Sequence, residues 1–175
     1  YGGSLMSILK VDTINEKTTG NGVVIPSGQT LNVSAGTLIP SAGHIVQHVT
    51  SDLTSPASTV INTTSYSDIT GATVNITPKY QDSVILIMFD IFVYIPANKI
   101  GYLLITDGSN NSIGGVYTPW SQSSNRDLHI SGHQHYSFNS TSQQTVKLRA
   151  KANDTTNQTW GGQRQLTLSV MEIKQ

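Results

Sequence analysis

Apolar and polar residues alternate along most of the chain from His44 to the last residue. Such alternation places successive side chains on opposite faces of a strand, and clusters of Gly, Pro, Asn, Asp and Ser separate the runs. The pattern predicts about nine strands and almost no helix, over residues 44–53, 58–62, 67–76, 84–95, 100–106, 112–117, 127–138, 144–152 and 165–174. Short strands at this spacing are typical of an all-β sandwich or barrel, and we expect a jelly-roll β-sandwich.

The run Val84–Ile95 is different because both of its faces are apolar. One face carries Ile85, Ile87, Phe89, Ile91, Val93 and Ile95, and the other carries Val84, Leu86, Met88, Phe92 and Tyr94 around Asp90. An antiparallel strand with one side in water should not have two apolar faces. Either another part of the chain covers the second face or a neighbouring subunit does, and we expect the second face to form the interface of a homotrimer.

Two details of the predicted strands leave alternatives open. Asp90 either accepts hydrogen bonds from neighbouring groups or, if three copies approach a threefold axis, binds a cation or shares protons. In the last strand the apolar parity is regular from Leu166 to Val170 and then shifts by one residue at Met171. This shift predicts a β-bulge or a change of strand partner.

The N-terminal part of the chain contains one short phrase twice, as Val24–Gly28 (VIPSG) and Leu38–Gly43 (LIPSAG). Each copy combines apolar residues with a Pro and a Gly, which fits a strand-turn unit too small to bury its own apolar side. Such units are stabilised by identical copies wound around a shared axis. We therefore expect residues 1–43 to form an extended stalk or attachment segment and residues 44–175 to form the head.

Composition narrows the range of functions. Of the 175 residues, 37% are hydrophobic and only 11% are charged, with a net charge of zero and no cysteine. A chain without excess charge has no broad attraction for nucleic acids or anionic membranes, and its longest apolar run is too short to cross a bilayer as a helix. The N-terminus does not look like a secretory signal, and Met6 would make a natural translation start, which leaves residues 1–5 as either an addition or authentic sequence.

Histidines gather in the predicted strand 127–138. If this segment is extended, His129, Ser131, His133 and His135 project from one face. His133 and His135 could then ligate one metal ion, and a trimer with this strand beside its axis would bring the imidazoles of three copies together. The alternative is an exposed polar strand face. We expect no other cofactor.

Motifs of catalysis are missing from the sequence. There is no Gly-x-Ser-x-Gly elbow, no Gly-x-x-x-x-Gly-Lys phosphate loop and no His-Glu-x-x-His pair. Asp52, Asp68, Asp82 and Asp107 lie mostly beside turn residues, where Asp caps its own backbone. We therefore expect that the protein is not an enzyme.

Two predicted loops combine an aromatic residue with polar side chains. The first holds Tyr117, Trp120 and Arg126, and the second holds Trp160 and Arg164. Aromatic rings stack on the apolar faces of sugars while amide and guanidinium groups bind hydroxyls, so both loops are candidates for binding a neutral or weakly charged glycan. Alternatively, the two tryptophans pack against the rim of the sandwich.

Several phrases resemble fibre and appendage proteins of tailed phages of marine bacteria, including cyanophages. They are Met6–Ile14 (MSILKVDTI), Gly20–Val23, Pro26–Leu31, Thr64–Pro78, the strand at Val84 and Leu166–Ile173. His133–His135 is similar to the His-x-His motif that holds metal ions in the long tail fibres of T-even phages. The resemblance implies a trimeric virion protein with a jelly-roll head, and its motifs have no catalytic content.

Within this resemblance the place on the virion stays open. The chain is short for a complete tail fibre, so it is a receptor-binding tip, a short fibre or knob on the tail, or a trimer that decorates the capsid. Residues 1–43 would attach the head to other virion proteins. Three functions remain: a structural appendage, an adhesin for a host surface glycan and, with least support, a glycan-cleaving enzyme.

Overall fold

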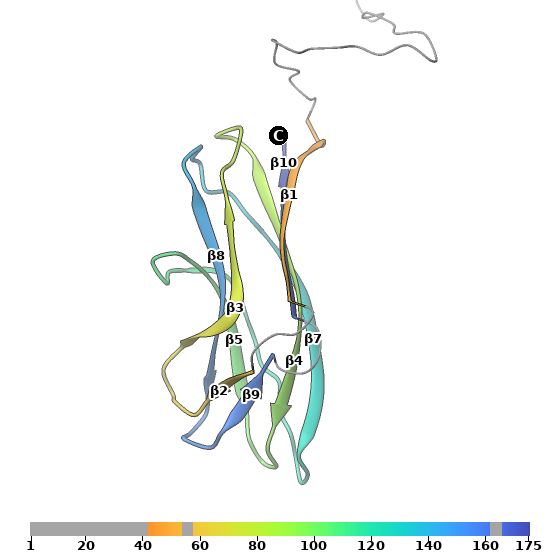
Figure 1. The fold of residues 1–175 in the computed structure, drawn as a ribbon, viewed down its shortest axis with the longest axis vertical. Coiled ribbons are helices and arrows are strands. Elements are labelled where there is room, and N and C mark those ends of the chain that lie inside the picture. Colours follow the sequence, from red (N-terminus) through yellow and green to blue (C-terminus); the bar gives the residue numbers. More distant parts are fainter. Residues whose placement is uncertain (1–41, 54–57, 162–165) are drawn as a thin grey trace, which may run out of the picture. The chain divides into compact units, whose positions relative to one another are not determined.

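The computed structural model describes residues 42–53, 58–161 and 166–175 (Figure 1). Contacts divide the chain into two units, Tyr1–Ile39 and Pro40–Gln175, and every described residue belongs to the second. Nearly all of the predicted stalk therefore lies outside the described residues, and its prediction stays open.

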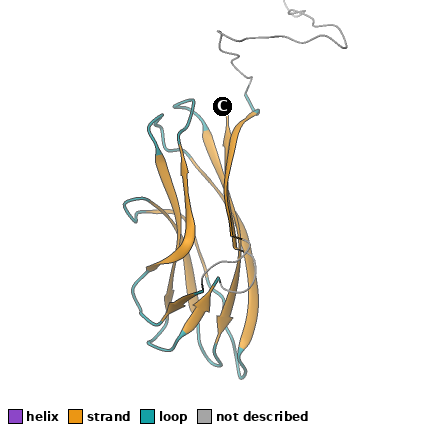
Figure 2. Ribbon diagram, viewed as in Figure 1, coloured by secondary structure: helices purple, strands orange, loops and turns teal. Residues whose placement is uncertain are grey.

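The described residues form ten β-strands and no helix (Figure 2). In chain order the strands are β1 (Ile45–Leu53), β2 (Thr59–Ile61), β3 (Ser67–Ile76), β4 (Val84–Ile95), β5 (Gly101–Asp107), β6 (Ser112–Tyr117), β7 (Arg126–Tyr136), β8 (Gln144–Ala152), β9 (Gln158–Trp160) and β10 (Leu166–Ile173). All of the predicted strands are present, and β9 is an additional short one. This part of the chain contains no helix that could span a membrane.

Two antiparallel sheets face each other, as Figure 1 shows. Sheet A has the strand order β1-β10-β4-β9-β2, with β7 paired to the remaining edge of β4, and sheet B has the order β3-β8-β5-β6. The all-β prediction is confirmed, and two antiparallel sheets packed in this way are compatible with a β-sandwich.

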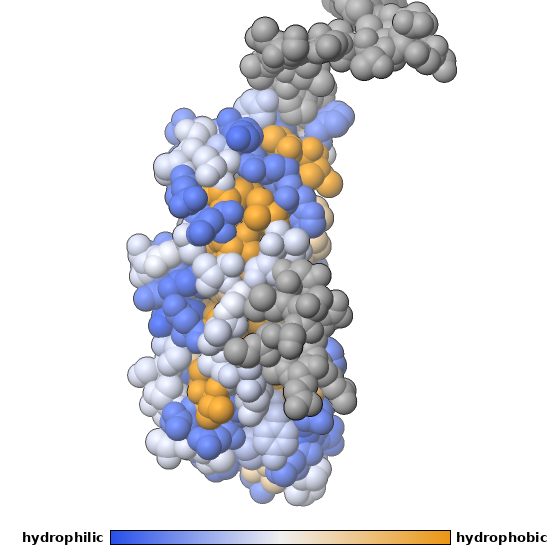
Figure 3. Space-filling view, viewed as in Figure 1, coloured by the Kyte–Doolittle hydropathy of each residue, from blue (hydrophilic) through white to orange (hydrophobic). Residues whose placement is uncertain are grey.

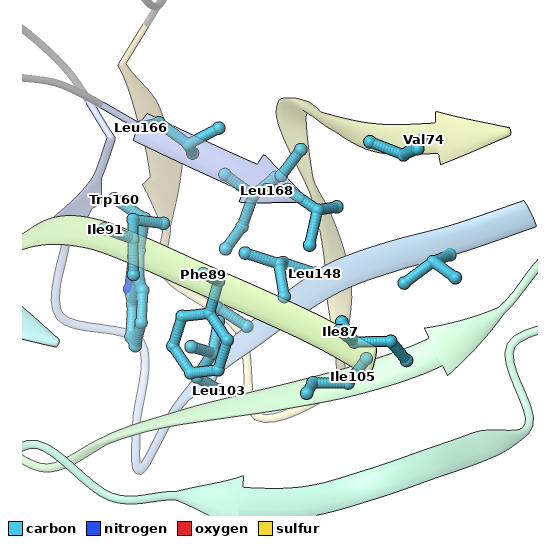
Figure 4. Close-up of a cluster of buried hydrophobic side chains, with 14 of the residues drawn as sticks. Val74, Ile87, Phe89, Ile91, Leu103, Ile105, Leu148, Trp160, Leu166 and Leu168 are labelled. Carbon is cyan, nitrogen blue, oxygen red and sulfur yellow. The ribbon is translucent and has the colours of Figure 1, made fainter. Parts of the chain in front are cut away.

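The hydrophobic core lies between the two sheets (Figure 4). Sheet A contributes one face of β4 and the inward residues of β10, and sheet B contributes inward residues of β3, β5 and β8. The largest contributions include Ile85, Ile87, Phe89, Ile91, Leu103, Ile105, Leu148, Leu166 and Leu168. One of the two apolar faces of β4 is therefore buried within the chain itself. It lies on the same side of sheet A as the inward residues of the neighbouring strand β10.

The parity shift in β10 involves no change of partner, and the irregularity beside it lies in the partner strand β1 and not in β10 itself. β10 pairs with β4 in continuous register from Leu166 to Ile173, and the irregularity in β1 falls between Ile45 and Gln47. The inward position that follows Val170 is occupied by Glu172, which is fully buried. A carboxylate can take such a position because it is hydrogen-bonded there.

The Glu172 carboxylate ties β10 to the turn between β3 and β4. It accepts backbone N–H bonds from Lys79 at 2.8 Å and Tyr80 at 3.0 Å, and side-chain bonds from Ser83 at 2.8 Å and Gln47 at 2.6 Å. Burial by itself would raise the pKa of Glu172, but these four hydrogen bonds outweigh it and lower the pKa below its ordinary value.

Candidate functional site

Four large hydrophobic side chains are more than half exposed, and they lie on two surfaces of the described part. Val116 and Trp120, 53% and 56% exposed, line an open hollow beside β6 and β7. Ile45 and Val60, 61% and 54% exposed, lie on the outward face of sheet A, as the strand register shows. The side of the molecule in Figure 3 carries apolar patches that are separated by polar side chains.

The first surface is a hollow of about 750 Å³ between two sheet edges. β6 is the edge strand of sheet B, β7 pairs only with β4 in sheet A, and the loop 118–125 connects them. The lining residues are Val116, Tyr117, Thr118, Pro119, Trp120, Gln122, Arg126, Leu128, His129 and Ile130. We call this hollow the β6–β7 groove.

Tyr117 lines the β6–β7 groove and contacts both sheets. Its hydroxyl donates a hydrogen bond to the backbone oxygen of His133 on β7 at 3.1 Å, so the side chain bridges the two edge strands. Its ring meets the ring of Phe89 edge to face, with centroids 4.8 Å apart. The ring also lies directly over Gly132, where a Cβ atom would come within 2.6 Å of it. Tyr117 is thus fixed by packing as well as by hydrogen bonding.

Backbone hydrogen bonds hold the loop that carries Trp120. Pro119 O accepts a bond from Gly101 N at 2.9 Å, and Ser121 N donates to Lys99 O at 3.0 Å. Ile100 and Trp120 form an isolated antiparallel bridge. The exposed indole therefore stands on a backbone that is attached to the β4–β5 connection. A preformed platform of this kind loses little conformational entropy when a ligand binds.

Arg126, Leu128 and Ile130 form one wall of the groove. They occupy alternate positions of β7 and face the same side as their partners Ile95, Val93 and Ile91 on β4, with Leu128 and Ile130 half-buried. The wall is therefore apolar toward the core and cationic at its outer end. None of the residues that line the groove is an Asp or a Glu.

The structure brings together three of the five predicted ligand residues. Tyr117, Trp120 and Arg126 all line the β6–β7 groove. The prediction for Trp160 is wrong: its side chain is fully buried, because β9 pairs with β4 and β2 and turns the ring into the core (Figure 4). Arg164 lies outside the described residues.

Sequence reasoning missed the contribution of the strand β7 to this groove. Leu128 and Ile130 line it, although the sequence places them only in an ordinary strand, and so does His129, which the sequence places on a histidine-bearing strand face. The alternation of Leu128 and Ile130 with polar neighbours was visible in the sequence. What the sequence did not show is that β6 and β7 are both edge strands and lie on the same side of the two sheets.

The second surface is the outward face of sheet A. Val84, Leu86, Met88, Phe92 and Tyr94, the predicted interface residues, are half-buried and all point to this face. Paired residues of neighbouring strands point the same way, so Met171 of β10 and His135 of β7 flank Leu86, and Ser169 and His133 flank Met88. Among the described strands, none packs over Leu86 and Met88. An interface with other subunits stays a prediction.

The predicted sharing of one face by the β7 histidines is confirmed. His129, His133 and His135 lie opposite Phe92, Met88 and Leu86 of β4. The His133 and His135 rings have centroids 6.1 Å apart. No cluster of three or more His, Cys, Asp or Glu side chains suited to a metal ion occurs in the described ranges, and metal binding by this pair stays a prediction.

Asp90 lies on the same outward face, exposed to solvent. Its carboxylate is 3.4 Å from Nδ1 of His129, and both side chains are about half exposed. This contact agrees with the simpler of the two expectations, in which Asp90 has a polar neighbour within the chain. An exposed pair of this kind contributes little to stability.

Most other charged side chains of the described part are paired. Asp68 binds Lys147 at 3.0 Å and Arg149 at 2.6 Å. Lys99 pairs with Asp154, and Lys174 pairs with Asp82. Hydrogen bonds from Lys99 and from the backbone N–H of Thr156 lower the pKa of Asp154 to about 2.

Comparison with known protein families and with curated proteins finds no match. The features of this chain that bear on its function are the two sheets, the β6–β7 groove and the outward face of sheet A.

Proposed function

We propose that the protein is a structural virion protein of a tailed bacteriophage: the homotrimeric head of a fibre or appendage that takes part in attachment to the host surface. The observation that carries this proposal is the second apolar face of β4. Its side chains Leu86 and Met88 lie in the middle of sheet A, where no other described strand covers them. An apolar stripe in the middle of a sheet face is typical of a surface that binds another protein or another copy of the same chain.

A closed homo-oligomer is the simplest cover for this face. The apolar residues of this face form a stripe along β4, between polar outward positions on β1 and β7. Ile45 on β1 and Val60 on β2 lie on the same face, and both side chains are more than half exposed. The low charge of the chain permits close approach of identical copies. A trimer agrees with the resemblance to phage appendage proteins and with a stalk of residues 1–43 wound around the same axis.

The strand order supports a jelly-roll head. Without the short strands β2 and β9, sheet A reads β1-β10-β4-β7 and sheet B reads β3-β8-β5-β6. Two such sheets of antiparallel strands, with the chain crossing repeatedly from one sheet to the other, have the arrangement of a jelly roll. Trimeric heads of this kind suit the end of a fibre or a knob on a virion.

Attachment to the host would use the β6–β7 groove. Trp120 and Tyr117 supply aromatic rings, and Gln122, Thr118 and Arg126 supply polar groups that match sugar hydroxyls. Residues 1–43 would contact other virion proteins. The protein would then be located on the virion, at a tail fibre or at the capsid surface, with neither nucleic acid nor membrane insertion as part of its role.

The trimer is tested by measuring the molar mass of the full chain in solution by light scattering at micromolar concentration. We expect three times the chain mass of 18.8 kDa. The double variant Leu86→Gln/Met88→Gln should dissociate, because it places amides on the outward face of sheet A. The control Val116→Gln replaces an exposed apolar residue on β6 and should remain trimeric. A monomeric wild-type chain would overturn the proposal.

The alternative is a capsid decoration or head-fibre protein without receptor binding. Attachment of residues 6–40 to a capsid protein, together with unchanged adsorption of virions carrying Trp120→Ala, would favour it. A glycan-cleaving enzyme has less support, since the described lining of the groove offers no carboxylates for acid and base catalysis. Release of new reducing ends from a host polysaccharide would favour the enzyme.

A further inference from the structure

We infer that the β6–β7 groove selects a sugar that carries one carboxylate, a uronic acid, with the carboxylate bound by Arg126 and the sugar ring stacked on Trp120. This inference rests on the attachment role proposed above and names the chemical class of the ligand. It does not depend on the trimer.

The first support is the charge of Arg126. Of the two arginines in the described ranges, Arg149 binds Asp68, whereas the guanidinium of Arg126 has neither an ion pair nor a hydrogen bond to another described residue. Its sequence neighbour Asp127 faces the other side of β7, opposite Tyr94. Because the lining of the groove has no Asp or Glu, Arg126 has no competing carboxylate within the groove. The guanidinium of Arg126 can therefore bind an anionic group of a ligand in the groove.

The second support is the number of cations. Arg126 is the only Lys or Arg among the described residues that line the groove, and His129 is the only other basic side chain. A nucleic acid or a heavily sulfated chain is bound by rows of cations, which this groove does not have. A guanidinium instead presents a planar fork that matches one carboxylate with two parallel hydrogen bonds. One unpaired arginine in the groove predicts one negative charge on the bound sugar.

The third support is the placement of the exposed indole. Trp120 is 56% exposed and lines the same hollow as Arg126, while Leu128 and Ile130 form an apolar wall beside the guanidinium. A pyranose has an apolar face that stacks on an indole and polar groups at its rim. A uronic acid combines both features in one ring, which a free acetate or an acidic peptide does not. The groove volume is within the usual range for small-ligand sites.

The experiment is calorimetric titration of the full chain with an oligogalacturonate and with the matching neutral galacto-oligosaccharide. We expect the acidic sugar to bind about tenfold more tightly at low salt, the size of effect that one charge-assisted fork can give. Arg126→Gln should abolish this preference and leave the weak neutral binding unchanged. Trp120→Ala should weaken the binding of both sugars. Lys79→Gln removes an exposed lysine from the β3–β4 turn and should change neither.

Other results of these titrations would contradict either the uronic acid inference alone or the attachment role as well. Equal affinity for the two sugars, or a preference that survives in Arg126→Gln, would overturn the uronic acid inference and leave the attachment role intact. Binding of neither sugar by a folded wild-type chain would overturn the inference, and unchanged virion adsorption by Trp120→Ala would then overturn the attachment role as well. Circular dichroism of each variant separates a loss of binding from a loss of fold.

Discussion

The ring of Tyr117 meets the ring of Phe89 edge to face, with centroids 4.8 Å apart and planes at 82°. Tyr117 belongs to the edge strand of sheet B and Phe89 to the middle of sheet A, so this contact joins the two sheets beside the β6–β7 groove. The contact is possible because Gly132 of β7 has no side chain to occupy the same space.

The first prediction concerns this glycine. In Gly132→Ala, the new methyl group would lie 2.6 Å from the Tyr117 ring and 2.8 Å from the Phe89 ring, so at least one ring must move. We expect a loss of about 1–3 kcal/mol in the free energy of unfolding, as for other overpacked sites. Urea denaturation measures it.

Gly115 on β6 provides the matched control. A Cβ atom built there meets nothing within 4 Å, so Gly115→Ala should leave stability unchanged or slightly raised. Equal stability of the two alanine variants would show that Tyr117 and Phe89 can move aside at no cost, and that the groove is not held by this contact.

The second prediction concerns Glu172. Replacing this residue by Gln puts an amide group among donors that now bind a carboxylate, and should cost about 2–3 kcal/mol at neutral pH. Because the folded-state pKa is lowered below the unfolded one, the carboxylate contributes its full stability above the unfolded pKa, and this contribution is lost as the pH falls through the folded pKa. The wild type should therefore lose stability below about pH 4.5 faster than Glu172→Gln.

Asp82→Asn is the control for this experiment. Asp82 is an exposed carboxylate whose pKa is lowered by a hydrogen bond from Lys174, and an exposed pair contributes little. Its loss should therefore change stability only slightly at neutral pH. Parallel stability curves of wild type and Glu172→Gln across acidic pH would contradict the assigned role of the buried carboxylate.

Most of the strands could be predicted because apolar and polar residues alternate within each of them. The runs that form β3, β4, β6 and β8 were predicted with the bounds that the structure has. The short strand β9 was missed because three residues carry no recognisable period. The inward position of Glu172 could not be predicted from the sequence for a different reason. It depends on hydrogen-bond donors in the distant turn at Lys79 and Ser83, and local alternation carries no information about contacts between distant segments.

The candidate site could be predicted only in part. Tyr117, Trp120 and Arg126 lie close together in the sequence, so one loop and its flanking strands bring them to one groove. Trp160 has the same kind of polar neighbours in the sequence, yet pairing of β9 with Val93 of β4 places its ring in the core. Whether an aromatic residue near a turn is exposed depends on such pairing between distant segments.

The third prediction concerns the N-terminal part of the chain. The buried core residues that the structure describes lie in β2 or later strands, Val49 of β1 packs against them, and the first described strand begins at Ile45. A chain that starts at residue 42 should therefore fold and unfold cooperatively in urea, with the near-ultraviolet dichroism of the full chain. Loss of cooperative unfolding would show that residues 1–41 are part of the same folding unit, which would contradict the division into a stalk and a head.

The last prediction separates the two tryptophans. Trp160 is fully buried in the hydrophobic core, so Trp160→Ala should cost about 3–5 kcal/mol through lost burial and a cavity. Its Nε1 has no hydrogen-bond partner among the described residues, so Trp160→Phe should cost less, since no polar bond is lost. Trp120 is mostly exposed, and Trp120→Ala should change stability by less than about 0.5 kcal/mol.

The effects of the two substitutions on ligand binding should be the reverse of their effects on stability. Trp120→Ala should weaken binding to the oligosaccharides and adsorption to host cells, because its indole is the exposed ring of the groove. Trp160→Phe should bind like the wild type at a temperature where both are folded, because its ring is buried and does not line the groove. Thermal unfolding and calorimetry on the same four proteins measure both properties. A Trp120→Ala variant that is destabilised but binds normally would show that this tryptophan is a packing residue and would remove the main support for an adhesin.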